Sequence, residues 1–327
     1  MATKLMITNT QGKSFFPLVE EGIQWTTDRR GTPGTLKFTV LKDKALGALG
    51  GFGEGSAVNL IVDGKTLFYG FVFVKQRDKT NGGGVIQCTA YDQIRYLKNK
   101  DTYVYENKTA DAFIKMVAAD YGLNIGSMES TSYVIPTRTR ENETLLDMIE
   151  DALDLELTNQ KQMFVLYDDA GKLTLKNISS MKVGLLIDPA TGENFDYTSS
   201  IDEQTYNQIK LTYDNEETGK REIYIAKDSS HINDWGLLQY FDTLKEGENG
   251  AAKADALLSL YNSKTRKLKI VKAFGDTRVR AGSLVAVSLN LGDIIANTYM
   301  LVEKAVHTFN ESEHWMDLTL RGGEFIA

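Results

Sequence analysis

Hydrophobic and polar positions alternate through the first hundred residues, as expected for strands that bury one face and expose the other. The alternation is clearest in GIQWTTD (22–28) and GTLKFTVLK (34–42). Asp63 and Gly64 separate two such runs, and Asp-Gly is typical of a two-residue hairpin turn. We therefore predict an antiparallel β-barrel or sandwich over residues 1–100.

The middle of the chain changes to a helical period. Hydrophobic positions recur three and four residues apart in TADAFIKMVAADYG (109–122) and NETLLDMIEDALDL (142–155). Thr109 and Gly122 are suitable cap residues for the first helix, and a shift of 35 residues aligns Thr109 with Thr144. We expect two helix–strand modules that pack together, because neither buries its apolar face alone. The predicted buried positions are Ala110, Phe113, Ile114, Val117 and Tyr121, then Leu145, Met148, Ile149, Ala152 and Leu153.

The last part of the chain returns to strand patterns, with one helix predicted at about 250–263. The apolar face of that helix would consist of Ala254, Leu257, Leu258 and Tyr261. The sequence thus predicts a mainly β fold, in which strand-rich segments at both ends of the chain flank an α+β insert of two helix–strand modules.

Composition narrows the class of protein. The 327 residues include 37 Lys and Arg against 44 Asp and Glu, a net charge of −7, which does not suit a surface that grips nucleic-acid phosphates. A single cysteine, Cys88, allows no disulfide within the chain and is expected to be a small buried strand residue. We see no secretory leader and no apolar stretch of membrane-spanning length, so we expect folding in a reducing cytoplasm without membrane insertion.

A glycine-rich segment, residues 46–56, raises the question of nucleotide binding. It contains Gly51-Phe52-Gly53, but Ser56 stands where a dinucleotide fingerprint requires its last glycine. The segment also lacks the Lys-Ser/Thr pair of a phosphate-binding loop. We interpret it as a loop and predict no cofactor-binding residue.

Two of the three histidines, His307 and His314, flank Glu311 and Glu313, a set that could suggest a metal or acid–base site. No cysteine or third histidine joins them. A two-residue turn would place the histidines opposite each other, but Asn-Glu is a poor pair for it. We prefer a four-residue turn over 310–313, which pairs Phe309 with His314. Core positions would then be Met316, Leu318 and Leu320, and no metal ligand is predicted.

Other candidate catalytic groups also have simpler explanations. The sequence has no G-x-S-x-G, and His231 lies in SSHINDWG without a recognisable partner for nucleophilic catalysis. Glu150 and Asp151 are adjacent on a predicted helix, so their carboxylates diverge, and we interpret them as a solvated face. The alternating residues 267–270 (KLKI) are interpreted as a solvated edge. We predict no catalytic residue and no enzyme activity.

The carboxyl-terminal fifth of the chain, KLKIVKAFGDTRVRAGSLVAVSLNLGDIIANTYMLVEKAVHTFNESEHWMDLTLRGGEF (267–325), resembles the closing segment of late-control and baseplate hub proteins of contractile phage tails. TADAFIKMVAADYGLNI, the region around 142–177, KDSSHINDWGLLQYFDTL and AYDQIRYLKN (90–99) resemble earlier segments of the same family, in the same order. The likeness is to hubs of Gram-positive prophages and phage-tail-like bacteriocins. The matching positions are Gly282, Val285, Tyr299, Val302, Val306, His307, Leu318 and Leu320.

This resemblance implies a homotrimer whose subunits each contribute two tail-tube-like antiparallel barrels. In this chain the first barrel would span residues 1–100 and the second 201–327, assembled from about 200–230 and 265–327, with the helix–strand modules at 101–200 between them. Three chains would form a ring of six barrels that adapts a hexameric tail tube to a trimeric spike, because a heterologous interface closes when its rotation divides a full turn. Implied partners are the tube protein, the central spike and other baseplate proteins, such as one with a peptidoglycan-binding module. The protein would assemble in the bacterial cytoplasm and end in the baseplate of a phage or tail-like particle.

Two further expectations depend on that assignment. Three chains would carry 3 × −7 = −21, and we expect an acidic lumen that DNA passes without sticking. The chain lacks a lysozyme-like segment, so we expect no cell-wall cleavage. The alternative is a cell-wall-degrading or carbohydrate-binding tail protein.

Overall fold

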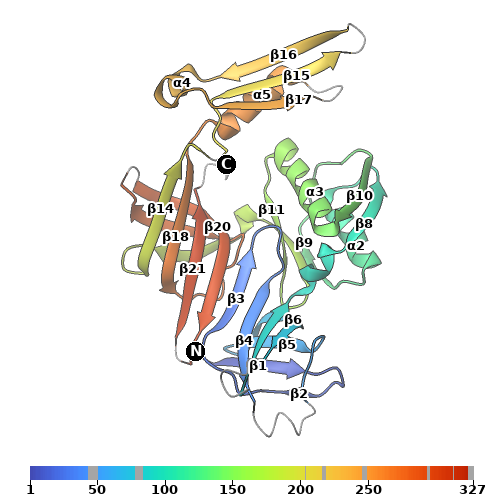
Figure 1. The fold of residues 1–327 in the computed structure, drawn as a ribbon, viewed down its shortest axis with the longest axis vertical. Coiled ribbons are helices and arrows are strands. Elements are labelled where there is room, and N and C mark those ends of the chain that lie inside the picture. Colours follow the sequence, from blue (N-terminus) through green and yellow to red (C-terminus); the bar gives the residue numbers. More distant parts are fainter. Residues whose placement is uncertain are drawn as a thin grey trace. The chain divides into compact units, whose positions relative to one another are not determined.

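The computed structural model describes residues 1–42, 51–77, 84–202, 204–215, 219–244, 249–292, 295–311 and 313–322. Strands dominate it (Figure 1). The chain divides into two compact units, one of residues 1–196 with 269–327 and one of residues 197–268. No helix in the described ranges is long and apolar enough to cross a membrane.

Seven strands form the first lobe of the larger unit, in the spatial order β3-β4-β7-β6-β5-β1-β2. The predicted turn is confirmed, since Asp63 and Gly64 both have positive φ and join β5 to β6. Cys88 is buried in β7, as predicted. The lobe's strands are β1 (Thr3–Thr8), β2 (Ser14–Phe15), β3 (Ile23–Asp28), β4 (Thr35–Leu41), β5 (Ala57–Val62), β6 (Lys65–Gln76) and β7 (Val85–Tyr91).

The insert follows as helix–strand modules around one core. Helix α2 (Ala110–Asp120) starts after Thr109 and ends before Gly122, whose φ of +61° fits its predicted role. Helix α3 (Leu145–Gln160) runs five residues beyond the predicted end, and Thr144 caps it by accepting from Asp147 N–H. The other elements are η1 (Gln93–Lys98), β8 (Lys100–Tyr105), β9 (Ile125–Met128), β10 (Arg138–Thr144), β11 (Phe164–Asp168), β12 (Leu173–Asn177) and η2 (Ile178–Ser180).

The two helices of the insert share their apolar partners, as the repeated pattern predicted. Buried residues of α2 and α3 belong to one hydrophobic cluster, which also contains residues of β11 and β12. Each predicted core position is buried except Tyr121, which is partly buried at the rim of this cluster. The modules therefore stabilise each other by sharing one apolar interior.

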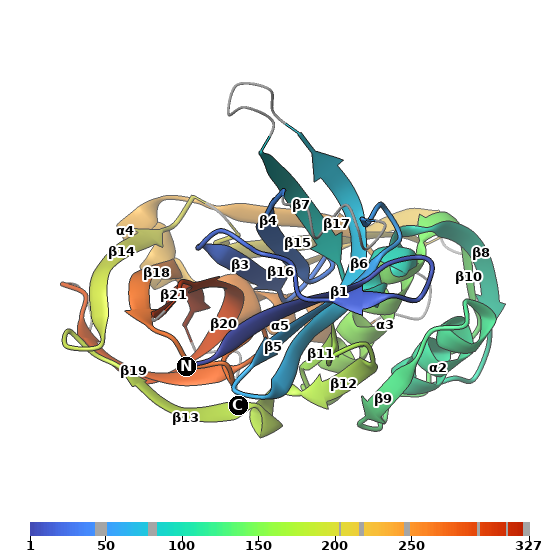
Figure 2. The ribbon, with the colours of Figure 1, turned by 90° about the horizontal axis from the view of Figure 1, so that it is seen from below.

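A second group of strands follows the insert and belongs to the same sheet as the first lobe. The long strand β20 (Ile295–Phe309) pairs with β19 through residues 295–301 and with β3 through residues 304–309. Figures 1 and 2 show β20 beside β3. The remaining strands of this second lobe are β13 (Lys182–Ile187), β14 (Gly192–Ser200), β18 (Thr265–Phe274), β19 (Leu284–Asn290) and β21 (His314–Arg321).

Sharing β20 merges the two lobes into a single 13-stranded sheet. Phe309, at the end of β20, lies in the hydrophobic core of the first lobe. A strand that hydrogen-bonds to both lobes leaves no edge between them, and so fixes their register. The mainly β fold with an α+β insert is confirmed, while the boundaries at residues 100 and 200 stay predictions.

The small unit differs from its predicted assignment. Residues 200–230 were expected to join the second barrel, but among the described strands β15 (Gln208–Asn215) pairs only with β16 (Lys220–Lys227) and β17 (Gln239–Thr243). The reason is local: β15 uses both of its edges inside this sheet, and α5 (Gly250–Tyr261) packs on β15 and β16. Helix α4 (Ser229–Trp235), which the hydrophobic pattern did not reveal, is capped by Asp228.

Candidate functional site

The histidine-containing hairpin has the predicted register. Phe309 pairs with His314 and His307 with Met316, and the N–H of Asn310 donates to the carbonyl of Glu313 at 2.9 Å. The turn residue 312 lies outside the described residues. The predicted core positions Met316, Leu318 and Leu320 are all buried.

The same register brings the two histidines into contact, which the sequence analysis did not expect of a four-residue turn. Nδ1 of His307 lies 2.8 Å from Nε2 of His314. His314 sits two residues from Met316, the direct partner of His307, so the rings are diagonal neighbours on one face, within reach of each other. The two histidines are therefore not direct partners across the hairpin, but their imidazole rings still touch.

The hydrogen-bond pattern defines the protonation of this pair. Nε2 of His307 lies 2.9 Å from the carbonyl of Val279, and a carbonyl only accepts, so Nε2 carries the proton. Nδ1 of His307 must then accept from Nε2 of His314. Burial, with a smaller effect from His314, lowers the pKa of His307 to about 3, and burial lowers that of His314 to about 4. Both rings are neutral near pH 7, and they stabilise the strands rather than carry charge.

Metal binding at this hairpin has no further support. Within the described ranges, no group of three or more His, Cys, Asp or Glu side chains is arranged to hold an ion. His231, the third histidine, stacks on Trp235 with ring centroids 3.9 Å apart and bonds to Asn262 at 2.7 Å. Its contacts are those of a helix-packing residue.

A cluster of buried ionisable groups lies where the first lobe, the insert and the second lobe meet. Asp92, just before η1, accepts from the N–H groups of Gly34 and Ile94 at 2.9 and 3.0 Å. Asp168, at the end of β11, accepts from the side chain of Gln93 at 2.8 Å and from the N–H of Gly171 at 2.7 Å. Burial raises the pKa of both carboxyls, and for Asp92 the neighbouring Asp168 adds to the effect.

Arg280 completes this junction from the segment between β18 and β19. Its guanidinium donates to the carbonyl of Asp168 at 2.9 Å and lies 3.7 Å from the ring centroid of Tyr167. The backbone N–H of Ala281 donates to Thr27 in β3 at 2.9 Å. Burial lowers the pKa of Arg280, but from so high a starting value that the side chain stays cationic. We call Asp92, Gln93, Asp168 and Arg280 the buried junction.

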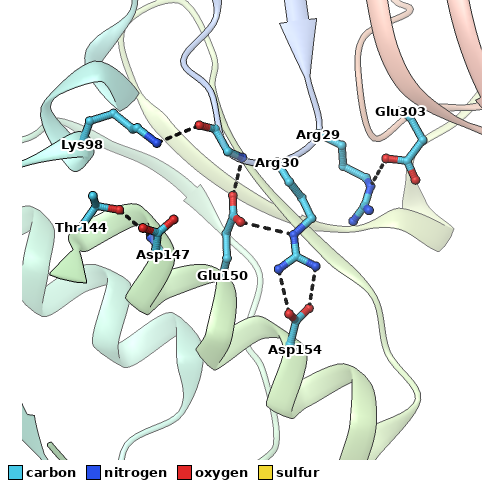
Figure 3. A network of polar contacts seen from close by, with 9 residues as sticks. Arg29, Arg30, Lys98, Thr144, Asp147, Glu150, Asp154 and Glu303 are labelled. Carbon is cyan, nitrogen blue, oxygen red and sulfur yellow. Dashed lines mark hydrogen bonds and ion pairs between the residues drawn. The ribbon is translucent and has the colours of Figure 1, made fainter. Parts of the chain in front are cut away.

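A second polar contact joins the first lobe to the insert near the surface (Figure 3). Arg30, in the turn after β3, reaches α3 with a two-pronged contact to Asp154 at 2.7 and 2.9 Å and a longer one to Glu150 at 3.3 Å. Glu150 also accepts from the N–H of Gly31 at 2.6 Å. We call Arg30, Gly31, Glu150 and Asp154 the arginine clamp.

The clamp corrects the expected role of Glu150 and Asp151. Their side chains do diverge, since Asp151 pairs with Arg140 and Glu150 turns to Arg30 and Gly31. Glu150 is not part of a solvated face, however, because only 17% of its side chain is exposed. The cavity beside the clamp has a volume of about 30 Å³, room for about one or two water molecules. These carboxylates hold segments together and enclose no substrate-sized site.

The buried junction could not be found from the sequence. Asp92, Asp168 and Arg280 are separated by 76 and 112 residues, and each stands in a different predicted element. Only Asp92 gives a local signal, because an aspartate before a helical turn is a typical cap. All three arrive in one place through sheet pairing that the chain alone does not reveal.

Comparison with known proteins agrees with this architecture. The Phage-like element PBSX protein XkdQ of Bacillus subtilis is 29% identical over 309 residues, covering 92% of each chain. The 43 kDa tail protein of prophage MuSo2 from Shewanella oneidensis has the same fold, with a TM-score of 0.68, 13% identity and coverage of 97% and 98%. The E. coli c3393 protein, a type VI secretion component, gives a TM-score of 0.56 at 10% identity, covering 98% and 77%.

The resemblance found in the sequence is thereby confirmed, and with it the fold of phage tail proteins. The model of the YQBQ-like family matches residues 23–321, which include the shared strand, the histidine hairpin, the arginine clamp and the buried junction. The chain belongs to the YQBQ-like family.

Proposed function

We propose that this chain is the structural hub protein of a phage-type tail baseplate. Three copies form a ring of six sheet-rich lobes that adapts a hexameric tail tube to a trimeric spike. The spike, the tube protein and further baseplate proteins are its partners, and assembly in the bacterial cytoplasm precedes incorporation into the particle.

The pairing of β20 with β3 is the observation that carries this proposal. It places two strand-rich lobes side by side in one chain through a hydrogen-bonded sheet. Each chain thus supplies two units to a ring, and threefold symmetry of chains supplies six. The c3393 protein is described as similar to the T4 tail proteins gp27 and gp5, which supports a place in a phage-type tail.

Mass measurement and electron microscopy of the purified chain, alone and with the tube protein of the same particle, test the proposal. The expected result is a trimer with six peripheral densities, formed alone or on the tube. A monomer that neither trimerises nor binds the tube end would contradict it.

We also propose that the chain acts without catalysis. The buried carboxylates bind backbone N–H groups or arginines, and the two contacting histidines are neutral, with His307 buried and His314 half-buried. Incubation with purified peptidoglycan should release no soluble fragments. Reproducible release by the pure protein, lost on heating, would favour the cell-wall-degrading alternative.

The acidic lumen follows from the net charge of −7 per chain and remains part of this proposal. A ring structure with a lumen lined mainly by lysine and arginine would overturn it. The hub assignment itself would survive that outcome, because the ring depends on sheet pairing and not on the sign of the lumen charge.

A further inference from the structure

An aromatic groove lies on the larger unit, between the outer side of β6 and the η1–α2–β9 part of the insert. Its volume is about 310 Å³, at the lower end of the ~300–1,000 Å³ range usual for ligand pockets. Four aromatic side chains and two exposed asparagines define its chemistry. They are Tyr69, Phe71, Tyr96, Asn99, Tyr121 and Asn124.

The groove walls are held in place by contacts that lining residues make with one another and with neighbouring segments. Buried Gln93 bonds both the N–H and the carbonyl of Asn124, at 3.0 and 3.2 Å, and so fixes that residue's backbone. The hydroxyl of Tyr121 donates to Asp101 at 2.8 Å. On the opposite wall, Gly171 lies so near the ring of Tyr69 that a Cβ there would come within 2.8 Å of it. A site with walls fixed in this way loses little entropy on binding.

The polar groups at the groove remain available to a ligand. No hydrogen bond is formed within the described residues by the side-chain amides of Asn99 and Asn124 or by the hydroxyls of Tyr69 and Tyr96. Each amide can both donate and accept, and so can each hydroxyl. Half-buried rings that alternate with free amides suit a ligand with one apolar face and a rim of hydroxyl groups.

The lining also excludes charged ligands. No Asp, Glu, Lys, Arg or His is among the ten lining residues. A single-stranded nucleic acid would require basic side chains along its phosphates beside the stacking rings. A purely apolar peptide segment would leave the asparagine amides and tyrosine hydroxyls unpaired, at a cost in affinity.

From these observations we propose that the groove binds a neutral oligosaccharide, with a pyranose ring stacked on the Tyr96 side and its hydroxyl or acetamido groups bonded to Asn99 and Asn124. Pyranose rings present an apolar C–H face and equatorial polar groups, which is the pattern that the groove complements. This binding is independent of the proposed ring assembly, because every lining residue belongs to one chain.

The test is calorimetric titration of the full-length chain with N,N′,N″-triacetylchitotriose, which carries acetamido groups, and separately with cellotriose, which does not. Saturable binding of at least one sugar is expected. The variant Tyr96→Ala should weaken it about tenfold, the upper range for loss of one stacked ring. Tyr299→Ala removes an exposed tyrosine on β20, away from the groove, and should leave binding unchanged.

Tyr96 also contacts Phe71 and Phe73, so Tyr96→Ala could weaken binding by disturbing the fold. A second variant separates this effect from the loss of a ligand contact. Asn99→Ala with Asn124→Ala changes two exposed side chains and should retain the melting temperature while weakening binding several-fold. Absence of saturation with both sugars up to ~10 mM, a range in which even weak sites are detected, would overturn the proposal. Saturable binding that Tyr96→Ala and the double asparagine variant both retain unchanged would overturn it as well.

Discussion

The buried junction and the arginine clamp both join the first lobe to the insert. The first does so among buried side chains, and the second does so at the solvent-exposed surface. The guanidinium of Arg280 packs against Tyr167 and its Nε atom is buried, whereas 39% of the Arg30 side chain is exposed. Both arginines have carboxylate-bearing neighbours, but Asp92 and Asp168 near Arg280 are buried, whereas 48% of the Asp154 side chain that pairs with Arg30 is exposed to water. The difference shows that similar ion contacts contribute very different free energies, depending on what remains when one partner is removed.

Removing Arg280 should have the largest effect. Arg280→Ala leaves the carboxylate cluster of Asp92 and Asp168 without its buried cation and deletes the contact with Tyr167. We expect the free energy of unfolding to fall by about 3–5 kcal/mol, measured by urea denaturation. The exposed Arg278→Ala is the matched control and should unfold near the wild-type midpoint; equal losses for both variants would contradict the comparison.

The second prediction concerns the pH dependence of stability that arises from two histidines held neutral in the fold. The pKa values of His307 and His314 are lowered to about 3 and about 4 from an ordinary 6.5, so the unfolded chain binds their protons first. Their contribution is complete above pH 6.5 and is lost as the pH falls from about 6.5 towards 4 and then 3, with a limiting slope of about 1.4 kcal/mol per pH unit for each proton.

Comparing the wild type with a His314 variant isolates the histidine contribution to this pH dependence. Asp92 and Asp168 have raised pKa values, so their contribution has the opposite sign: it is complete at low pH and is lost as the pH rises through their folded-state pKa. His314→Gln keeps an amide that can donate to His307 and removes one titrating ring. The free energies of unfolding of the wild type and of His314→Gln should converge as the pH falls from 6.5 to 4. If the two curves stayed parallel, the pKa of His314 would not be lowered in the folded protein.

Gly275 tests the packing around the histidines. Its N–H donates to the carbonyl of His314 at 2.8 Å, and an added Cβ would overlap the ring of His314. Gly275→Ala should therefore cost about 1–3 kcal/mol, the usual range for overpacking. Gly184→Ala, at a position where an added Cβ meets nothing within 4 Å, is the control for thermal melting. A Gly275→Ala protein as stable as this control would mean that the His314 ring can move aside.

The smallest effect is expected at the clamp. Arg30→Ala should lower the free energy of unfolding by about 0.5–1 kcal/mol, and added salt should reduce the difference, because exposed ion pairs are screened. Arg30→Lys would keep the charge and lose the two-pronged contact with Asp154. A loss as large as that of Arg280→Ala would show that the clamp is desolvated in solution.

Local features were predicted well because they depend on neighbours in the sequence. The Asp63-Gly64 turn, the caps Thr109 and Gly122 and the apolar faces of both insert helices follow from conformational preference and periodicity over a few residues. Helix α4 was missed because it has no buried residue and so no apolar face to detect.

The sequence by itself determined the strand and helix periods, the histidine hairpin's register and the resemblance to tail proteins, since these are encoded by short-range patterns. Only the tertiary structure decided that β15 lies in a sheet separate from the second lobe, that β20 joins β3, and that Asp92, Asp168 and Arg280 meet. Strand partners are chosen by burial and edge pairing across the whole chain. The histidine hairpin illustrates both cases. Its turn could be predicted from the sequence, but the contact of His307 with His314 joins side chains that are diagonal neighbours across the strands, and it became visible only in the structure.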